Sequence, residues 1–364
     1  MSGRGVLPRA LWLQWPLALG IGWASCHDAA ISPTATVAPT AMENVHLLGR
    51  FTDEPRGPRF AYPGSAIATR FRGTAIEVTL DDTGHSHFDV VLDGGAPTLL
   101  VTGGDTKVFS IARDLPPGEH ALMLIKRTES FQGVVRFGGF RVANGTLVPA
   151  PLPFTRRIEM IGDSITCGYG NLGASKDCGY APETSNENVA WGALAAKDLR
   201  AMHTSIAYSG RAVFQNRNVG DDDELMGVVW LRTLPDDRAS MWDFTRYLPD
   251  AVVINLGTND FAHGDPGADF VPAYEALVKS VRAKYPAATI VCAVGPMLEA
   301  PLHRVLARYV ESAIAMVHDP KVSFLDLPPQ NRSTEIGCDY HPNQASQAKM
   351  ATALAAHLRR QLGW

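Results

Sequence analysis

The chain has 364 residues, of which 46% are hydrophobic and 19% are charged, and its formal net charge is −4. This length is enough for about two domains, each able to bury a core of its own. The weak negative charge gives no electrostatic case for binding nucleic acid, and we expect no such partner.

Residues 1–26 have the pattern of an export signal. Two arginines precede a mostly apolar run over residues 10–24, which is too short for a comfortable membrane span. Small residues then precede Cys26, as at the processing site of a bacterial lipoprotein, although Trp23 stands where that pattern usually has leucine. We therefore expect an exported bacterial protein, periplasmic, extracellular or anchored to the outer membrane by a lipid on Cys26, with plain cleavage near that residue as the alternative.

Residues 27–43 are rich in Ala, Thr and Pro, a composition typical of a flexible tether. A pattern of period two follows over residues 44–147, with short strand-like segments at 75–80, 88–92 and 107–111 separated by Gly, Pro and Asp turn signals. Short strands at this spacing, with no helical stretch between them, predict a β-sandwich. Three prolines in residues 148–155 indicate a linker.

Over residues 156–364 strand-like and helical patterns alternate. Apolar side chains recur at helical spacing in residues 302–313 and 350–362. Five short apolar runs lie at residues 158–161, 204–208, 251–256, 288–294 and 322–327. Strands separated by helices predict a parallel sheet covered on both faces, with ligands bound beyond the carboxyl ends of the strands.

Beyond Cys26 the chain has four cysteines. Cys292 lies in a strand-like run and is expected to be a buried thiol. The other three flank candidate chemistry, and a Cys167–Cys178 disulfide is one plausible pairing among them and Cys338, although the sequence does not fix the connectivity. The spacing is not that of a zinc site, and three consecutive aspartates at 221–223 are interpreted as a solvated loop, so we expect no metal and no cofactor.

The most informative segment joins the strand-like run 158–161 to Gly162, Asp163 and Ser164. A serine at the end of a buried strand, at the mouth of a helix, is rigidly held and has free backbone N–H groups beside it. Those are the requirements of a nucleophile, although Gly-Asp-Ser also forms ordinary turns.

Three other strand ends carry residues that could serve the same chemistry. Gly210 can turn its N–H toward a neighbouring site, or simply form a turn. The Asn259 amide can donate to an oxyanion, or cap a helix. His341 lies in a loop before the last helix, with Asp339 two residues earlier, and could be a general base with its orienting acid or an ordinary histidine.

Taken together, these segments resemble the four blocks of the SGNH (GDSL-type) hydrolase superfamily, and most closely carbohydrate esterase family two. The segments are GDSITCGYGN, YSGR, INLGTNDF and CDYHPN. The resemblance covers residues 44–364 and implies a jelly-roll β-sandwich before a three-layer α/β/α hydrolase domain with a parallel sheet. It implies that Ser164 is the nucleophile and His341 the base, with an oxyanion hole of the Ser164 and Gly210 N–H groups and the Asn259 amide.

One departure from the superfamily concerns the group that orients His341. Most members have an acid three residues before the histidine, where this chain has Cys338. Two readings stay open: Asp339 orients the ring, or a backbone carbonyl does so and leaves a Ser–His dyad. In either case protonation of His341 would stop the reaction, so we expect activity to fall below about pH 6.

The family resemblance further implies removal of O-acetyl groups from polysaccharides such as xylan or glucomannan. Aromatic rings that could pack on sugars are Trp230, Tyr340 and Phe261, whereas Trp191 and Trp242 are expected in the core. The alternatives are an esterase or thioesterase acting on lipids, acyl thioesters or cell-wall O-acetyl groups, and a non-catalytic glycan-binding protein. The sequence leaves the oligomeric state open, with a monomer favoured.

Overall fold

The structure, a computed structural model, describes residues 41–152, 154–218 and 224–364. The predicted export signal with Cys26, most of the predicted tether and the aspartates at 221–223 therefore lie outside the described residues. The end of the tether, from Ala41, belongs to a short 3-10 helix, η1 (Ala41–Asn44). None of the helices within these ranges is both long and apolar enough to cross a membrane.

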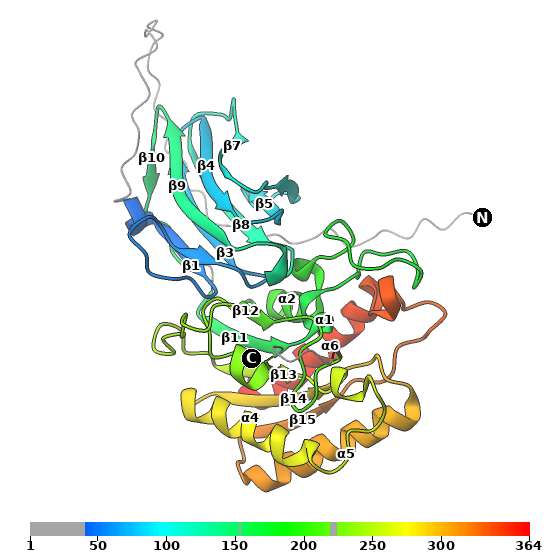
Figure 1. The fold of residues 1–364 in the computed structure, drawn as a ribbon. Coiled ribbons are helices and arrows are strands. Elements are labelled where there is room, and N and C mark those ends of the chain that lie inside the picture. The colour runs from blue at the N-terminus through cyan, green and yellow to red at the C-terminus, as the bar shows by residue number, and fades with distance from the viewer. Residues whose placement is uncertain (1–40, 153, 219–223) are drawn as a thin grey trace, which may run out of the picture.

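The N-terminal half consists of two antiparallel sheets packed face to face (Figure 1). The first sheet runs in the order β1 (Val45–Leu48), β3 (Ala66–Arg72), β8 (Glu119–Lys126), β5 (His87–Leu92) and β6 (Thr98–Val101), with β10 (Thr146–Val148) also paired to β3. The second runs in the order β2 (Arg59–Phe60), β9 (Val135–Ala143), β4 (Ala75–Asp82) and β7 (Thr106–Ala112). Burial alternates residue by residue along β4 and β8, because one face of each sheet covers an aromatic-rich core.

The C-terminal half has a five-stranded parallel sheet. Its order is β12 (Ala201–Ala207), β11 (Arg156–Gly162), β13 (Ala251–Asn255), β14 (Thr289–Val294) and β15 (Val322–Asp326). Its helices are α1 (Ser164–Cys167), α2 (Trp191–Asp198), α3 (Met226–Val229), α4 (Phe270–Lys284), α5 (Ala300–Val317) and α6 (Gln344–Leu362). Short 3-10 helices are η2 (Ser130–Gln132), η3 (Glu187–Val189), η4 (Asn259–Phe261) and η5 (Cys338–Tyr340).

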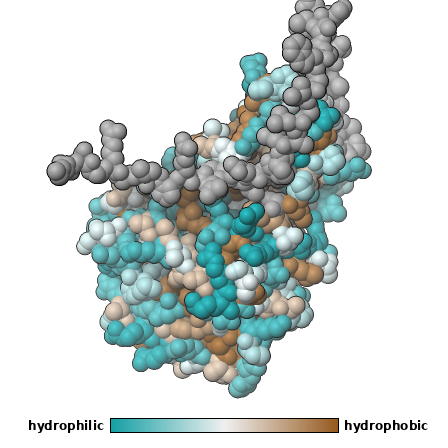
Figure 2. All heavy atoms as spheres, turned by 180° about the vertical axis from the view of Figure 1, so that it is seen from behind, coloured by the Kyte–Doolittle hydropathy of each residue, from teal (hydrophilic) through white to brown (hydrophobic). Residues whose placement is uncertain are grey.

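Helices cover both faces of this sheet. Tyr274 and Leu306, from α4 and α5, pack in one apolar cluster with the strands, whereas Trp191 and Leu354, from α2 and α6, pack in a second. The predicted fold class, a β-sandwich before a three-layer α/β/α domain, is thus confirmed. Over the back of the molecule, hydrophilic side chains are widespread and apolar ones form small groups (Figure 2).

The register of the parallel sheet brings the predicted motifs together. Gly162, the last residue of β11, pairs with Ala207 of β12 on one side and with Asn255 of β13 on the other. The loops that follow these three strands therefore leave the same edge of the sheet at the same level. Ser164, Gly210 and Asn259 lie within a few residues of these three strand ends, which explains how residues far apart in sequence can share one site.

The two halves share a buried interface near β12, the edge strand that β1 contacts. Arg50, which follows β1, is 1% exposed and pairs with Glu159 of β11 at 3.2 Å. The Tyr62 hydroxyl donates a hydrogen bond to the Val229 carbonyl at 3.0 Å. Because both side chains are buried among residues of the other half, the sandwich and the α/β domain are packed as one unit.

Candidate active site

Ser164 stands where strand β11 gives way to helix α1. Asp163 caps the helix, since its carboxylate accepts a hydrogen bond from the Ile165 N–H at 3.0 Å. A Cβ on Gly162 would lie 2.1 Å from the Thr166 hydroxyl, so only glycine fits before the cap. The turn is therefore tightly specified, and it leaves the Ser164 side chain at the carboxyl end of the sheet.

His341 contacts the candidate nucleophile directly. Its Nε2 lies 2.8 Å from the Ser164 Oγ, and its Nδ1 lies 3.2 Å from the Cys338 carbonyl oxygen. A carbonyl only accepts, so Nδ1 carries the proton, and Nε2 is left free to accept one from the serine. The ring is 3% exposed and stacks on Tyr169 with centroids 4.1 Å apart. Burial lowers the pKa of His341 to about 4, against the opposing effect of the Cys338 carbonyl, so the ring is a neutral base at pH 7.

The prediction that Asp339 orients His341 by a direct contact is not supported by this geometry. The Asp339 carboxylate accepts a hydrogen bond from the Tyr169 hydroxyl at 2.5 Å, while the Cys338 carbonyl accepts the hydrogen bond of His341 Nδ1. The physical reason is the left-handed backbone of η5, with φ of 49° at Asp339 and 64° at Tyr340, which places the Cys338 carbonyl beside Nδ1 of the histidine. Of the two readings left open, this geometry favours the Ser–His dyad.

A disulfide holds the carbonyl that orients His341. Cys338 is bonded to Cys178, whereas Cys167, which the sequence offered as a partner of Cys178, is a buried free thiol in α1. Cys292 is a buried free thiol, as predicted. The Cys338 N–H also donates to the Gly170 carbonyl at 3.0 Å, so this residue is anchored on both sides.

Three candidate hydrogen-bond donors follow three neighbouring strands of the parallel sheet. Neither the Ser164 N–H nor the Gly210 N–H donates to another residue in the described part of the chain. Gly210 adopts φ of +79°, a conformation that favours glycine. The Asn259 amide donates to the Arg211 carbonyl at 2.9 Å and to the Asp163 carboxylate at 3.3 Å, so it ties the serine loop to the Gly210 loop. The predicted donors thus come from loops that meet at one edge of the sheet.

A pocket of about 240 Å³ opens beside the dyad. It is lined by Ser164, Arg217, Thr258, Asn259, Phe261, Ala262, Met297, Leu298 and His341. Ligand pockets that enclose drug-sized molecules span about 300–1,000 Å³, so this one suits a small group. Gly210 is not among the lining residues, although its loop is tied to Asn259.

The prediction that Trp230 binds substrate is wrong. Its side chain is fully buried, with its ring under the guanidinium of Arg50 and 5.0 Å from the ring of Phe244. The polar residues before it in sequence suggested exposure, but α3 turns the indole into the interface between the two halves. Trp191 and Trp242 are buried, as expected for core residues.

The other two aromatic candidates differ in exposure. Phe261 lines the pocket but is 4% exposed, because its ring packs on Phe270 and Tyr309, and it presents no open face to a sugar. Tyr340 is 41% exposed and precedes His341 in the chain, so it stays a candidate for substrate contact.

Several residues at the site were not singled out from the sequence. Tyr169, which stacks on His341, lies within the first motif and could have been found from its place five residues after Ser164. Arg217, Met297 and Leu298 line the pocket from loops that carry no recognisable pattern. Their position follows from the fold alone.

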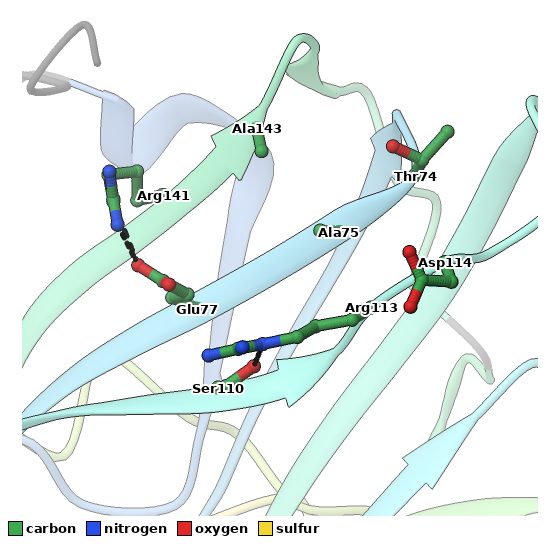
Figure 3. A pocket seen from close by; sticks show the side chains of 8 residues that line it. All are labelled: Thr74, Ala75, Glu77, Ser110, Arg113, Asp114, Arg141 and Ala143. Carbon is green, nitrogen blue, oxygen red and sulfur yellow. Dashed lines mark hydrogen bonds and ion pairs between the residues drawn. The ribbon is translucent and has the colours of Figure 1, made fainter. Parts of the chain in front are cut away.

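A second pocket, of about 210 Å³, lies on the solvent face of the sheet formed by β4, β7 and β9 (Figure 3). Two of its arginines are bonded within the pocket: Arg141 pairs with Glu77, and Arg113 donates to the Ser110 hydroxyl at 2.7 Å. It contains no nucleophile beside a base. Among the described residues, no cluster of acidic, Cys or His side chains is placed to hold a metal ion.

Comparison with known proteins gives matches over both halves. The family model "Carbohydrate esterase 2 N-terminal" matches residues 47–151, and that of the "GDSL-like Lipase/Acylhydrolase family" matches residues 160–349. The cellulase/esterase CelE of Acetivibrio thermocellus is 39% identical over 87% of the chain, which spans only 39% of CelE. An acetylxylan esterase/glucomannan deacetylase of Cellvibrio japonicus is 27% identical over 94% of the chain and 96% of its own length.

Solved structures show the same architecture. A family two carbohydrate esterase from Clostridium thermocellum, in complex with cellohexaose, superimposes with a TM-score of 0.84 and 38% identity, covering 88% of this chain and 99% of that one. A family two enzyme from Cellvibrio japonicus gives a TM-score of 0.85 at 26% identity, covering 92% and 99%.

Proposed function

Since the chain belongs to carbohydrate esterase family two, we propose that it is an exported serine esterase that removes O-acetyl groups from polysaccharides such as acetylated xylan or glucomannan. The observation that carries this proposal is the contact of 2.8 Å between the Ser164 Oγ and the Nε2 of a neutral His341. The Ser164 and Gly210 N–H groups, which have no acceptor among the described residues, add to it. A serine hydroxyl is too weak a nucleophile to attack unaided, and this contact supplies the base that it needs.

The proposed reaction has two halves. In the first, Nε2 of His341 takes the proton of Ser164, whose Oγ attacks the acetyl carbonyl, and the oxyanion accepts hydrogen bonds from the Ser164 and Gly210 N–H groups. The Asn259 amide joins them by turning one of its two N–H groups from the Asp163 carboxylate to the oxyanion. The imidazolium then protonates the departing sugar oxygen, which leaves an acetyl-serine. In the second half His341 deprotonates a water molecule, which attacks the acetyl-serine, and acetate leaves as Ser164 recovers its proton.

The choice of substrate rests on the pocket and on the relatives. A pocket of about 240 Å³ suits an acetyl group better than a long acyl chain. The relatives from Cellvibrio japonicus are described as acetylxylan esterases/glucomannan deacetylases, and the relative from Clostridium thermocellum was solved with a bound cello-oligosaccharide. Both descriptions favour a polysaccharide substrate over a lipid or an acyl thioester.

The proposal is tested by acetate release from acetylated xylan and glucomannan, together with a series of p-nitrophenyl esters of increasing acyl length. We expect acetate release from the polymers and a steep loss of rate beyond short acyl chains. Ser164→Ala should lower kcat by about 10⁴-fold or more, while Ser312→Ala, on the exposed face of α5, should leave it unchanged. A preference for acyl chains of about eight carbons would instead favour a lipid esterase, because such chains need a long apolar pocket.

Export is part of the same proposal and rests on the pattern of residues 1–26. Expression of the full chain in a bacterium, followed by fractionation, should place it outside the cytoplasm. If Cys26 carries a lipid, Cys26→Ser will move the protein from the membrane fraction to the soluble exported fraction. Retention of the wild-type chain in the cytoplasm would overturn this part of the proposal alone.

A further inference from the structure

Glu129 belongs to the β-sandwich, yet its carboxylate lies against the hydrolase half. It follows β8 and caps the short helix η2, and its side chain is fully buried. Its Oε2 accepts a hydrogen bond from the Ser209 N–H at 3.1 Å, and its Oε1 accepts one from the Ser209 hydroxyl at 2.5 Å. One carboxylate therefore binds both the backbone and the side chain of a single residue on the other half.

The residue that Glu129 holds directly precedes Gly210. The peptide unit joining Ser209 to Gly210 carries the Gly210 N–H, the proposed oxyanion donor, and the orientation of that N–H depends on the conformation of Ser209. Gly210 itself has left-handed φ and no Cβ, so it contributes no rigidity of its own. The two hydrogen bonds that Ser209 donates to the Glu129 carboxylate supply the restraint that the glycine lacks.

Glu129 is in turn held firmly by its own segment. The Nζ of Lys126, which is fully buried, donates to the carbonyls of Thr128 and Glu129 at 2.8 and 2.7 Å. The Arg127 carbonyl accepts a hydrogen bond from the Glu187 N–H of the hydrolase half at 3.1 Å. The segment that carries the Glu129 carboxylate is thus hydrogen-bonded both within the sandwich and to the hydrolase half.

Burial of a carboxyl group and an amine at this place is costly, since removing charged groups from water is unfavourable unless they are well bonded. Burial raises the pKa of Glu129 to about 7 and lowers the pKa of Lys126 to about 7. Replacing buried ionisable groups of this kind by apolar residues is often neutral or stabilising, so the arrangement is weak evidence for a role in stability. The polar arrangement therefore points to a task beyond stability.

We propose that Glu129 is a positioning residue for the reaction: it fixes Ser209 so that the Gly210 N–H points at the developing oxyanion. This inference rests on the proposed function and assigns the β-sandwich a part in catalysis. Glu129 touches neither the substrate nor the reacting atoms in this account. Its carboxylate also contacts the Cys167 thiol of α1, but the positioning effect proposed here is exerted through Ser209.

The test compares three variants of the full chain. In Glu129→Ala the Gly210 N–H loses its restraint, and kcat should fall about 10²–10³-fold, the loss expected for one oxyanion donor, with KM changed less than about threefold. Glu129→Gln should recover most of the rate, because its amide oxygen can accept from the Ser209 N–H and its NH₂ can donate to the Ser209 hydroxyl. Tyr62→Phe removes another buried hydrogen bond between the halves and should leave kcat unchanged.

A second measurement does not depend on activity. Hydrogen–deuterium exchange of a peptide covering residues 208–211 should be about 10-fold faster or more in Glu129→Ala, and unchanged in Tyr62→Phe. Unchanged exchange, or faster exchange with unchanged kcat, would overturn the positioning role, as would an equal loss of kcat in Tyr62→Phe. A wild-type chain that hydrolyses no ester would overturn the proposed function, and the catalytic role of Glu129 with it. The exchange rate of residues 208–211 would still test whether Glu129 restrains Ser209.

Discussion

At the scale of single residues, the character of His341, the proposed base, depends on burial and on a backbone carbonyl. Burial lowers its pKa to about 4, and the residues Asp339 and Arg217 act on it in opposite directions, the first raising and the second lowering the pKa. The expectation from the sequence, loss of activity below about pH 6, assumed an ordinary histidine. The buried ring stays neutral, and hence able to accept a proton, to lower pH.

The pH profile of kcat/KM follows from this shift. Because the pKa of His341 is lowered, the neutral base is present throughout the neutral range and is lost only as the pH falls through about 4. We therefore expect the acid limb of kcat/KM for p-nitrophenyl acetate to have its midpoint near pH 4 to 5. A midpoint at or above the ordinary value of about 6.5 would contradict the buried, neutral base.

Asp339→Asn tests which group orients the ring. The Cys338 carbonyl accepts the Nδ1 proton, so loss of the Asp339 charge should lower kcat less than about fivefold. Where an acid does hold the ring, the same change lowers kcat about 10⁴-fold. Steady-state kinetics on p-nitrophenyl acetate distinguish the two cases, with Ser164→Ala marking the background. A loss of about 10³-fold or more would restore Asp339 as the orienting acid.

At the scale of elements, the loop around η5 has to keep a carbonyl in place, and a disulfide does this. Cys178 and Cys338 are 160 residues apart in sequence. In the chain-entropy account a loop of that length contributes about 5 kcal/mol to the free energy of unfolding. Reduction therefore has two expected effects, one on stability and one on the orientation of His341.

Treatment with a thiol reductant should lower both Tm and kcat, and Cys178→Ser should do the same without reductant. The matched control is reductant added to Cys178→Ser, which should change nothing further. Tm is followed by circular dichroism and kcat by acetate release, with thiol counting to prove that the bond is open. Full reduction with unchanged kcat would show that the loop holds its carbonyl without the disulfide.

The elements were largely predictable from the sequence, whereas their side-chain contacts were not. Apolar runs such as 251–256 mark strands of a parallel sheet because both faces of the sheet are buried. Ser164 and Asn259 could be placed because a strand end is a local feature. The contacts of Asp339 could not be predicted, because they depend on the left-handed backbone at Asp339 and Tyr340. Neither residue type requires that conformation, so the sequence does not indicate it.

At the scale of the whole molecule, the sequence indicated two halves but not how they meet. The contacts of Arg50 with Glu159 and of Glu129 with Ser209 join residues 109 and 80 positions apart. No periodic pattern marks such pairs, since Arg50, Glu159 and Glu129 taken alone resemble surface charges and Ser209 resembles an ordinary turn residue. For the same reason, the sequence suggested that Trp230 contacts the substrate, although it lies in the interface beside Arg50.

The buried ion pair between Arg50 and Glu159 contributes to the free energy of unfolding of the whole chain. Arg50→Ala leaves the Glu159 carboxylate buried without its partner, which should lower the free energy of unfolding by about 3–5 kcal/mol. Lys279→Ala, which removes an exposed pair with Glu275, should change it by less than about 1 kcal/mol. Urea unfolding followed by fluorescence measures both. Equal effects of the two variants would mean that the interface contributes little to stability.

The central claim is that Ser164 carries the acetyl group, and mass spectrometry of the enzyme quenched during turnover of acetylated xylan tests it most directly. The account predicts an acetyl group on the peptide that contains Ser164, present while substrate remains, gone when it is exhausted, and absent from Ser164→Ala. Acetate release by Ser164→Ala at the wild-type rate, or an acetyl group on a different residue during turnover, would contradict it.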